Sequence, residues 1–565
     1  MEPPATCRAI ESCRATCACQ DKKNFDTLAI VDEDLSIFGP QLEALSTTRM
    51  LAPPKPRSPP HRSLCLRITF SCCALVTLAF LGLIAAEAAA GGKPSCEHPM
   101  LTFIDAKAQR HLPAPVAPAA TASWPRKGFD LNRTSSSPRA AARDLSAPAW
   151  SFFVGSVTYA TPVIDATGNI FVASTCGAII CISPEGRVLW TYHMGWVYPS
   201  SPVLLQGSLF VSDGAGNVYA LDAATGHPRW IRQFAGSRGT SDAFSLAGDE
   251  GILVATTWSG EPGAPTDGAT GGQLRALAPR TGEDLWVHEL PSSTYNHMPI
   301  ITSRAVIYSD TEGALWCLDR SSGARLWSTP PITLPQTGPA SLPAQHDGSY
   351  HDLADSLGGT SISHGGLIYA TGNADWYTGV ARAYRETSLE LAWEHTFPEL
   401  SLVANAAALS TIAGVPTLVL GVGLTPPLGL SYLLHPGSPE DSDGYARFDG
   451  TYRGRVVALH ATTGAALWTF DPPRYNGWMA AGQRPAWRGL PARINLPDSF
   501  ASPMVGADGV VYISYANGVL YALNGTDGSL ISSFQGESAQ AEPAVGPHGE
   551  LVVMMGTTLQ VFKDP

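Results

Sequence analysis

Charged residues are scarce in this 565-residue chain: Asp, Glu, Lys and Arg together make up 15%, against about 25% in ordinary globular domains. So low a charge excludes a coiled coil or a long solvated helix, whose surfaces are rich in charge. Basic residues are fewer than acidic ones, with 36 Lys and Arg against 48 Asp and Glu, which gives a net charge of −12. Because nucleic-acid binding depends on a basic surface, we expect no nucleic-acid partner.

Several catalytic signatures are also missing. The sequence has no glycine-rich phosphate loop between a strand and a helix, no Gly-x-Ser-x-Gly elbow and no His-Glu-x-x-His. Cysteine is concentrated at the N-terminal end, where seven of the eleven lie before residue 74. The first four have a spacing that a metal could use, but no His accompanies them. We therefore interpret residues 1–67 as a disordered tail.

One long apolar run stands out: the 19 residues Ile68–Ala86 carry no charge. About 20 apolar residues cross a bilayer as a helix. Basic residues precede the run and Glu87 follows it, so the positive-inside rule predicts a cytoplasmic N-terminus. We expect a transmembrane helix or signal anchor at 68–90, which binds the membrane and makes the protein single-pass. The alternative is a signal peptide that starts at Met50 and is cleaved within Ala85–Ala90, which would give a secreted protein.

The region after this helix changes composition. Residues 91–145 are rich in Ala, Pro and Ser, which predicts a flexible stalk. Two sequons, one at Asn132 and one at Asn524, fit glycosylation on the lumenal or extracellular side, although chance also produces such tripeptides.

Residues 146–565 carry an internal repeat whose clearest copy is Leu209–Trp230. It reads as strand, turn, strand, turn, strand, because apolar residues alternate and Gly marks each turn. Asp222 is expected to accept backbone hydrogen bonds of the second turn, and Gly226 to supply its positive φ. The closing Trp can cover the edge of the neighbouring sheet. The docking Trp positions are Trp150, Trp190, Trp230, Trp286, Trp327, Trp393 and Trp468.

The two ends of the array complete each other. Ser532 takes the Trp place in a further copy, and one more inner part follows it without an outgoing strand. The array begins with an orphan outgoing strand at Trp150. Since a single four-stranded sheet cannot bury both its faces, the units must stack. We therefore predict an all-β, eight-bladed propeller in which the strand at Trp150 pairs with the C-terminal strands and closes the ring.

The motif Ala-x-Asp-x-x-Thr-Gly-x-x-x-Trp, complete at Ala220–Trp230 and partial elsewhere, resembles the tryptophan-docking repeat of the PQQ-repeat family. The resemblance covers residues 150–565 and implies an eight-bladed propeller. The family includes quinoprotein alcohol dehydrogenases, which use PQQ and Ca²⁺, and a bacterial outer-membrane assembly lipoprotein without enzymatic activity. Cys181 and Cys317 occupy the place of Ala220, and we interpret them as small buried residues rather than disulfide partners.

The long insertions in the array are expected on one face of the ring, where loops carry function. They are Ser259–Gly272, Pro331–Asp355, Gly423–Tyr452 and Asp471–Asp498. A Thr-Gly-Asn run that ends at Asn373 lies on the same face. In quinoprotein alcohol dehydrogenases a similar run ends a strand, and its Asn ligates Ca²⁺. By resemblance Asn373 is the candidate calcium ligand, with Asp375 and Trp376 beside it at the cofactor site; a plain turn is the alternative.

The catalytic part of that family pattern is incomplete. Its catalytic Asp, shortly after the next docking Trp, is absent here, and Glu399 is the candidate base in its place. In one insertion His346, His351 and Asp352 form a set that could bind a metal, but their spacing matches no zinc signature, and a solvated loop is the alternative.

The repeat is intact while the catalytic pattern is eroded. Our leading hypothesis is therefore a membrane-tethered, non-cytosolic propeller that acts as a binding or scaffold module. Its protein or small-molecule ligand would bind the insertion-bearing face, and no cofactor is certain. The first alternative is a quinoprotein-type dehydrogenase that oxidises an alcohol or sugar with PQQ and calcium. The second is a lumenal ligand sensor.

Overall fold

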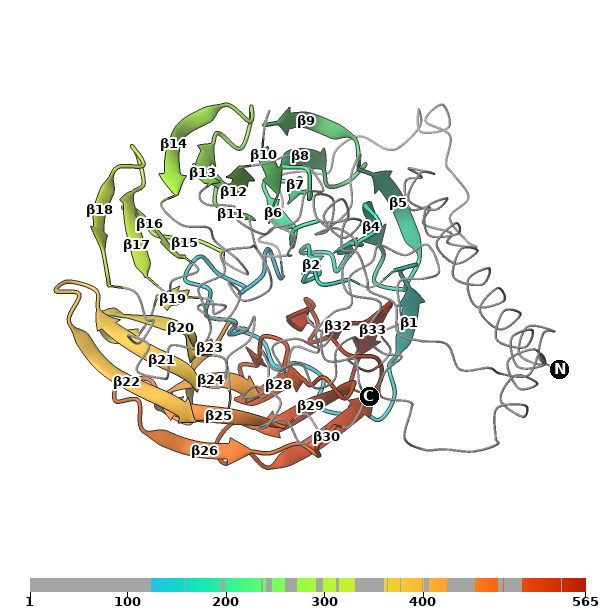
Figure 1. Ribbon diagram of the computed structural model, residues 1–565. Coiled ribbons are helices and arrows are strands. Elements are labelled where there is room, and N and C mark those ends of the chain that lie inside the picture. Colours follow the sequence, from blue (N-terminus) through green and yellow to red (C-terminus); the bar gives the residue numbers. More distant parts are fainter. Residues whose placement is uncertain are drawn as a thin grey trace, which may run out of the picture. The chain divides into compact units, whose positions relative to one another are not determined.

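The structure of the protein is a computed structural model that describes residues 123–564, apart from residues 157, 195–198, 235–236, 240–245, 260–271, 291–297, 311–313, 331–359, 363, 376–377, 399, 401–405, 424–452, 476–480, 482–499 and 540. The described residues form eight antiparallel sheets, arranged as blades around a central axis (Figure 1). They include one short 3-10 helix, η4 (His364–Gly366). None of their helices is long and apolar enough to cross a membrane. The expected tail, 1–67, and membrane segment, 68–90, lie outside the described residues.

Each blade runs from an inner strand A to an outer strand D. Blade 1 is β2 (Val163–Ile164), β3 (Ile170–Ala173), β4 (Ala178–Ile182) and β5 (Val188–His193); blade 2 is β6 (Val203–Leu205), β7 (Ser208–Ser212), β8 (Asn217–Asp222) and β9 (Pro228–Gln233). Blade 3 has a divided strand A, β10 (Ser237–Gly239) and β11 (Leu246–Gly248), followed by β12 (Leu253–Ser259), β13 (Gly272–Leu277) and β14 (Asp284–Leu290). Blade 4 is β15 (Ile300–Ile301), β16 (Ala305–Ser309), β17 (Leu315–Asp319) and β18 (Arg325–Ser328).

The second half of the ring repeats this plan. Blade 5 is β19 (Thr360–Ile362), β20 (Leu367–Asp375), β21 (Thr378–Arg385) and β22 (Leu391–Pro398); blade 6 is β23 (Ala408–Ile412), β24 (Val415–Gly423), β25 (Gly454–His460) and β26 (Ala466–Phe470). Blade 7 is β27 (Met504–Val505), β28 (Val510–Ser514), β29 (Val519–Asn524) and β30 (Leu530–Gln535); blade 8 is β31 (Ala544–Val545), β32 (Leu551–Met555), β33 (Thr558–Phe562) and β1 (Trp150–Phe153).

Blade 8 confirms the predicted closure of the ring. Strand β1 pairs antiparallel with β33, with Trp150 opposite Val561 and Phe153 opposite Thr558. The carboxylate of Asp564 accepts the backbone N–H groups of Arg143 and Asp144 at 2.9 and 3.1 Å. The two ends of the repeat array are thus hydrogen-bonded together, and β1 covers the outer edge of β33.

The docking turns behave as the motif predicts. The Asp222 side chain accepts the backbone N–H groups of Ala224 and Thr225 at 3.1 and 3.0 Å, and Gly226 has a φ of +72°. The Trp190 indole packs on Gly226, so closely that a Cβ there would lie 2.6 Å from the ring. Six docking tryptophans donate their indole N–H to a carbonyl of the next blade at 2.7–3.0 Å: Trp150, Trp190, Trp230, Trp286, Trp393 and Trp468.

The junction of blades 4 and 5 departs from this pattern. The turn of blade 5 has Leu389 where the other turns have Gly, and Leu389 adopts a φ of +60°. Its N–H bonds to the Arg385 carbonyl at 2.8 Å, the same bond that Gly226 makes to Asp222. At intact turns such as Gly226 and Gly464 a Cβ would lie 2.6 Å from the docked indole, so a side chain at this position is incompatible with that docking. Trp327, which should dock here, makes no indole hydrogen bond within the described part of the chain and is half-buried.

Residues 123–145 correct the prediction of a flexible stalk. Trp124 and Leu145 are completely buried, and both belong to the core cluster of blades 7, 8 and 1. The composition of this segment is that of a linker, but its few large apolar residues are placed where the ring can bury them. The described part of the expected stalk is therefore built into the propeller.

Candidate functional site on the propeller axis

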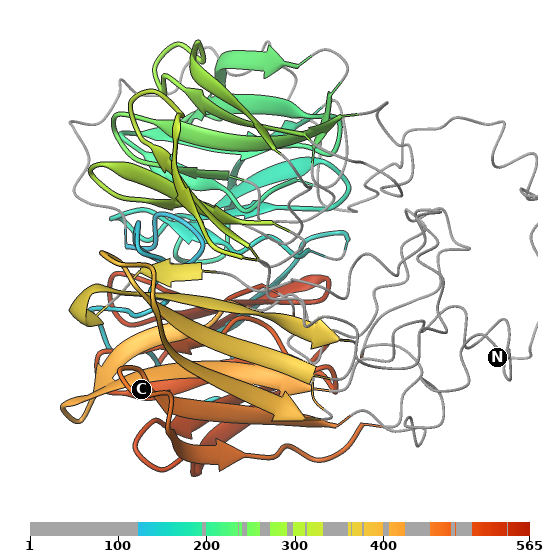
Figure 2. The same cartoon turned by 60° about the vertical axis from the view of Figure 1, so that its left-hand side comes forward.

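The A–B and C–D turns of the blades form one face of the ring, which we call the turn face; the B–C and D–A connections form the insertion face. Residues 123–142 follow the inner strands, and we call them the axial plug; Figures 1 and 2 show this blue segment within the ring. Trp124 and Ile164 exchange backbone hydrogen bonds of 3.0 and 2.8 Å. The plug also accepts the backbone N–H of Leu204, Ile301, Leu409 and Val505 at Pro125, Leu131, Thr134 and Ser135. It therefore contacts the inner strands of five blades.

The centre of the plug is a tight loop. The Asp130 carboxylate accepts the N–H and hydroxyl of Thr134 at 3.0 and 2.7 Å. Three residues other than Gly have positive φ angles: Phe129 (64°), Arg133 (59°) and Ser135 (53°). Each such residue costs about 1–3 kcal/mol and persists only where its surroundings dictate the backbone. The ring imposes this conformation, and concentrated strain of this kind is typical of functional segments.

The plug brings three cations into the interior. The side chains of Arg126, Lys127 and Arg133 are 7%, 0% and 2% exposed. They share the axis with Glu542, which precedes β31 and is completely buried. The Gly128 N–H donates to Glu542 Oε2 at 2.6 Å, and Arg133 Nη1 donates to the Met298 carbonyl at 2.8 Å. The loop is therefore bonded to blade 8 on one side and to blade 4 on the other.

Burial controls the protonation of this cluster. Desolvation lowers the pKa of Arg126 and of Arg133 to about 10 each, so both stay charged at neutral pH. Desolvation raises the pKa of Glu542, against the opposing effect of the neighbouring Lys127 ammonium. Trp124 Nε1 and Arg126 Nε are buried and have no hydrogen-bond partner among the described residues. The cluster thus offers buried charge and N–H donors, and this chemistry suits binding and anchoring.

The sequence analysis missed Glu542, although a signal was present. In other blades the residue before the Pro that begins the inner strand is small, polar or apolar: Thr161, Ser201, Met298 and Ser502. All four are buried on the inner side of their blades. Glu542 is the single acid at this repeat position, and its N–H donates to Thr161 Oγ1 at 3.2 Å. The axial plug explains why a carboxylate occupies this repeat position in blade 8, because the plug supplies the cations that surround Glu542.

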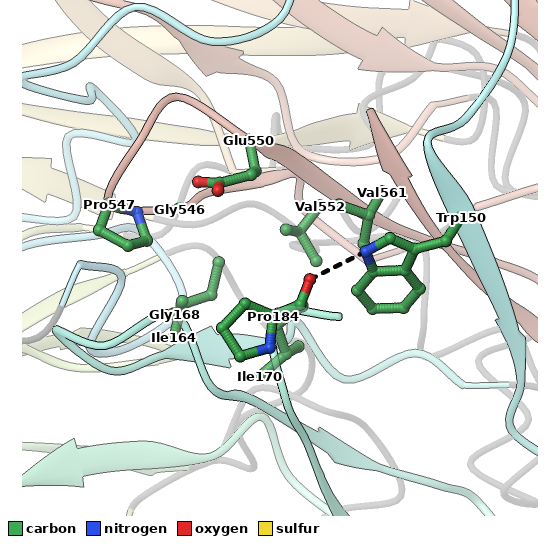
Figure 3. Close-up of a pocket in the computed structure, with 10 residues that line it drawn as sticks. All are labelled: Trp150, Ile164, Gly168, Ile170, Pro184, Gly546, Pro547, Glu550, Val552 and Val561. Carbon is green, nitrogen blue, oxygen red and sulfur yellow. Dashed lines mark hydrogen bonds between the residues drawn. The ribbon is translucent and has the colours of Figure 1, made fainter. Parts of the chain in front are cut away.

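A shallow depression with a cavity volume of about 10 Å³ lies on the turn face between blades 8 and 1 (Figure 3). It is mostly apolar and has one carboxylate, Glu550, which approaches the Lys563 ammonium at 3.6 Å. At its edge the Trp150 indole N–H donates to the Pro184 carbonyl at 3.0 Å. Substrate and cofactor pockets usually enclose about 300–1,000 Å³. This depression is therefore a seam beside a docking turn and is too small for a cofactor of the size of PQQ.

The topology places the expected calcium ligand on the insertion face. Asn373 lies near the end of β20, a strand B, with its backbone opposite Gly379. Asp375 follows across a register shift and faces Thr378. Thr371, two residues earlier, is buried. The run thus ends a strand, as the resemblance implies.

The other predicted site residues cannot be placed. Trp376, Glu399, His346, His351 and Asp352 lie outside the described residues. Among the described residues, no three His, Cys, Asp or Glu side chains gather to hold a metal ion. Asn373 and Asp375 are the two candidates whose backbone is described, and the described residues alone do not assemble a site that fits PQQ and calcium.

The two sequons lie in different surroundings. Asn132 is exposed at the tip of the plug loop, next to Arg133. Asn524 takes the place of Asp222 in the docking turn of blade 7, and its Oδ1 accepts the Thr526 N–H at 3.0 Å. The Trp468 indole donates to the Gly525 carbonyl of the same turn at 2.7 Å. A glycan at Asn524 would have to fit beside this packed turn, whereas Asn132 is open to solvent.

The fold and its docking turns define an eight-bladed propeller of tryptophan-docking repeats. A family model described as Outer membrane protein assembly factor BamB matches residues 147–341. Over 289 residues the chain is 26% identical to the outer membrane protein assembly factor BamB of Shewanella oneidensis, covering 50% of this chain and 59% of that protein. Over 335 residues it is 25% identical to the quinohemoprotein alcohol dehydrogenase of Comamonas testosteroni, covering 54% of this chain and 43% of that protein. These findings confirm the resemblance to the PQQ-repeat family, which the family model matches over residues 147–341.

Solved structures agree on the fold. The quinohemoprotein alcohol dehydrogenase of Comamonas testosteroni superimposes with a TM-score of 0.54 at 15% identity, covering 78% of this chain and 81% of that one. A europium-containing methanol dehydrogenase gives a TM-score of 0.53 at 12% identity, covering 76% and 89%. At such identities the likeness concerns the fold alone. The chain spans about half the length of the curated relatives it matches.

Proposed function

We propose that this propeller is a binding or scaffold module whose partner is a protein that docks on the insertion face. The observation that carries the proposal is the axial plug. The chain's own residues 123–142 occupy the axis and hydrogen-bond to the inner strands of five blades, with three buried cations arranged around Glu542. The propeller uses its axis for its own architecture, so its loops are the part left for recognition. The similarity to outer membrane protein assembly factors supports a protein partner.

We propose further that residues 68–90 hold the protein in a membrane and that the propeller lies outside the cytosol. The support is the uncharged run with basic residues before it. Protease protection of sealed membrane vesicles, compared before and after permeabilisation, tests this topology. The propeller should resist protease until the vesicles are opened, and digestion in sealed vesicles would refute the proposal.

The binding function is tested on the full chain in its own membrane. Chemical crosslinking followed by mass spectrometry should place partner crosslinks on the insertions, chiefly in the ranges 260–271 and 424–452. Replacing either insertion by a short Gly-Ser loop should remove those crosslinks and leave the propeller folded. Crosslinks that lie on the turn face instead, and that persist in both loop variants, would contradict the proposal.

A quinoprotein-type dehydrogenase is the second candidate, because Asn373 ends a strand B on the insertion face and a quinohemoprotein alcohol dehydrogenase is among the relatives. Detergent-purified full chain is titrated with PQQ and Ca²⁺, and dye reduction is followed with a panel of alcohols and sugars. A scaffold gives no saturable change in the quinone spectrum. Saturable binding that is lost in Asn373→Ala, with dye reduction that depends on Glu399, would establish the dehydrogenase instead.

A further inference from the structure

The cysteine of the first B–C turn differs from the other described cysteines. Cys176 is disulfide-bonded, whereas Cys181 and Cys317 are free and buried. Cys176 is only partly buried and lies in the turn between β3 and β4, on the insertion face. Its N–H donates to Ser156 Oγ at 3.3 Å, and its Sγ lies 3.1 Å from Ser174 Oγ. The turn holds the sulfur in a fixed place at the surface.

The positions of the other cysteines limit which of them can be the disulfide partner of Cys176. Apart from Cys181 and Cys317, every other cysteine of the chain lies at residue 96 or before. Cys65, Cys72 and Cys73 fall at or within the proposed membrane helix, and the first four cysteines precede it. By the proposed topology these seven are in the bilayer or on its opposite side. Cys96 is the remaining cysteine on the side of the propeller.

We propose that Cys96 and Cys176 form a disulfide that ties the segment preceding the axial plug to blade 1, and that the propeller acquires it in an oxidising compartment. This pairing rests on the proposed topology. The disulfide closes a loop that contains the whole plug, so it lowers the conformational entropy of the unfolded chain and thereby stabilises the folded propeller. Disulfides of this kind persist outside the cytosol.

The reaction is a thiol–disulfide exchange. The thiolate of one cysteine attacks a protein or low-molecular-weight disulfide, and one thiolate of that oxidant leaves. The thiolate of the second cysteine then displaces the other half. In total the protein loses two protons and two electrons, and the oxidant is reduced to two thiols. Cys181 and Cys317 stay out of the exchange, because burial raises the pKa of both thiols, to about 11 for Cys317.

Peptide mapping of the full chain tests the pairing. The protein is extracted from its membrane in the presence of a thiol-blocking reagent, denatured, blocked again and digested without reductant. We expect a crosslinked peptide pair that contains Cys96 and Cys176, and reagent adducts on Cys181 and Cys317. Cys96→Ser and Cys176→Ser should each abolish the pair and lower the melting temperature equally, and the double variant should melt no lower. Cys65→Ser is the matched control and should keep the pair.

The outcomes distinguish a failure of the proposed Cys96–Cys176 pairing from a failure of the proposed membrane topology. If Cys176 carries the blocking reagent in protein taken from its native membrane, the disulfide is refuted, and cytosolic exposure of the propeller in the protease experiment would then explain the failure. If Cys176 is oxidised but linked to another cysteine, or to a second copy of the chain, the pairing with Cys96 is wrong while the oxidising compartment stands. Unequal melting of the two single variants would also contradict the pairing.

Discussion

Leu389 provides the sharpest test of how the blades are held together. In the six intact docking turns an indole packs on the turn, and a Cβ on the glycine of several of them would lie 2.6 Å from the ring, as at Gly226, Gly323 and Gly464. Atoms cannot approach so closely, so a Leu in that place excludes the indole. The same residue stands at φ +60°, where a side chain is strained. Leu389→Gly should remove both obstacles at the junction of blades 4 and 5.

The expected gain can be worked out from these two facts. Relief of the strained left-handed conformation should raise the free energy of unfolding by about 1–2 kcal/mol. The greater conformational freedom of Gly in the unfolded chain should lower it by about 0.5–1 kcal/mol. The net stabilisation is about 1 kcal/mol. At an intact turn, Gly226→Ala should cost about 2–4 kcal/mol, from the same strain together with overpacking against Trp190. The two substitutions at equivalent positions therefore act in opposite directions.

The free energy of unfolding from urea titration, followed by tryptophan fluorescence, measures both effects. Leu389→Ala is the matched control: it keeps the strained φ and should give no gain. A double-mutant cycle with Trp327→Ala reports docking itself, because Trp327→Ala should cost about 1 kcal/mol more in the Leu389→Gly background than in the natural chain. If Leu389→Gly destabilises the protein, or if the cost of Trp327→Ala is the same in both backgrounds, the reasoning is wrong.

Three further predictions concern the plug and the sequons. Trp124→Ala should destabilise the protein by about 3–5 kcal/mol, because Trp124 is completely buried, and should cost clearly more than Trp327→Ala in urea titrations; equal costs would argue against a packed plug. The pKa of Glu542 is raised in the folded protein, so its contribution to stability is present below its unfolded pKa and is lost as pH rises through its folded pKa. The stability of the natural chain relative to Glu542→Gln should therefore improve as pH falls from 7 towards 4.5, and the opposite trend would show that the cations, not burial, dominate. If the propeller passes through a glycosylating compartment, Asn132→Gln should remove a glycan, whereas Asn524→Gln should leave the mass shift on glycosidase treatment unchanged; a glycan on Asn524 alone would refute this assignment.

The sequence determined the ring. Docking tryptophans such as Trp190 and turn glycines such as Gly226 are local signals that recur with each blade, and a strand pattern with an orphan outgoing strand at Trp150 has one way to close. These features depend on neighbours in the sequence or on the repeat itself, so they can be read without coordinates. The same logic correctly assigned Cys181 and Cys317 to buried positions.

Only the tertiary structure decided what the axis contains. Residues 123–145 have the composition of a linker, and nothing local distinguishes them from a stalk. Their conformation depends on hydrogen bonds to inner strands far along the chain, such as Gly128 to Glu542 and Thr134 to Leu409. Long-range contacts of this kind leave no periodic trace in the sequence, because a segment used once carries no repeat. The repeats in the sequence therefore predict the propeller. The plug and its buried charges depend on contacts between residues that are distant in the sequence, and these contacts form only in the folded ring.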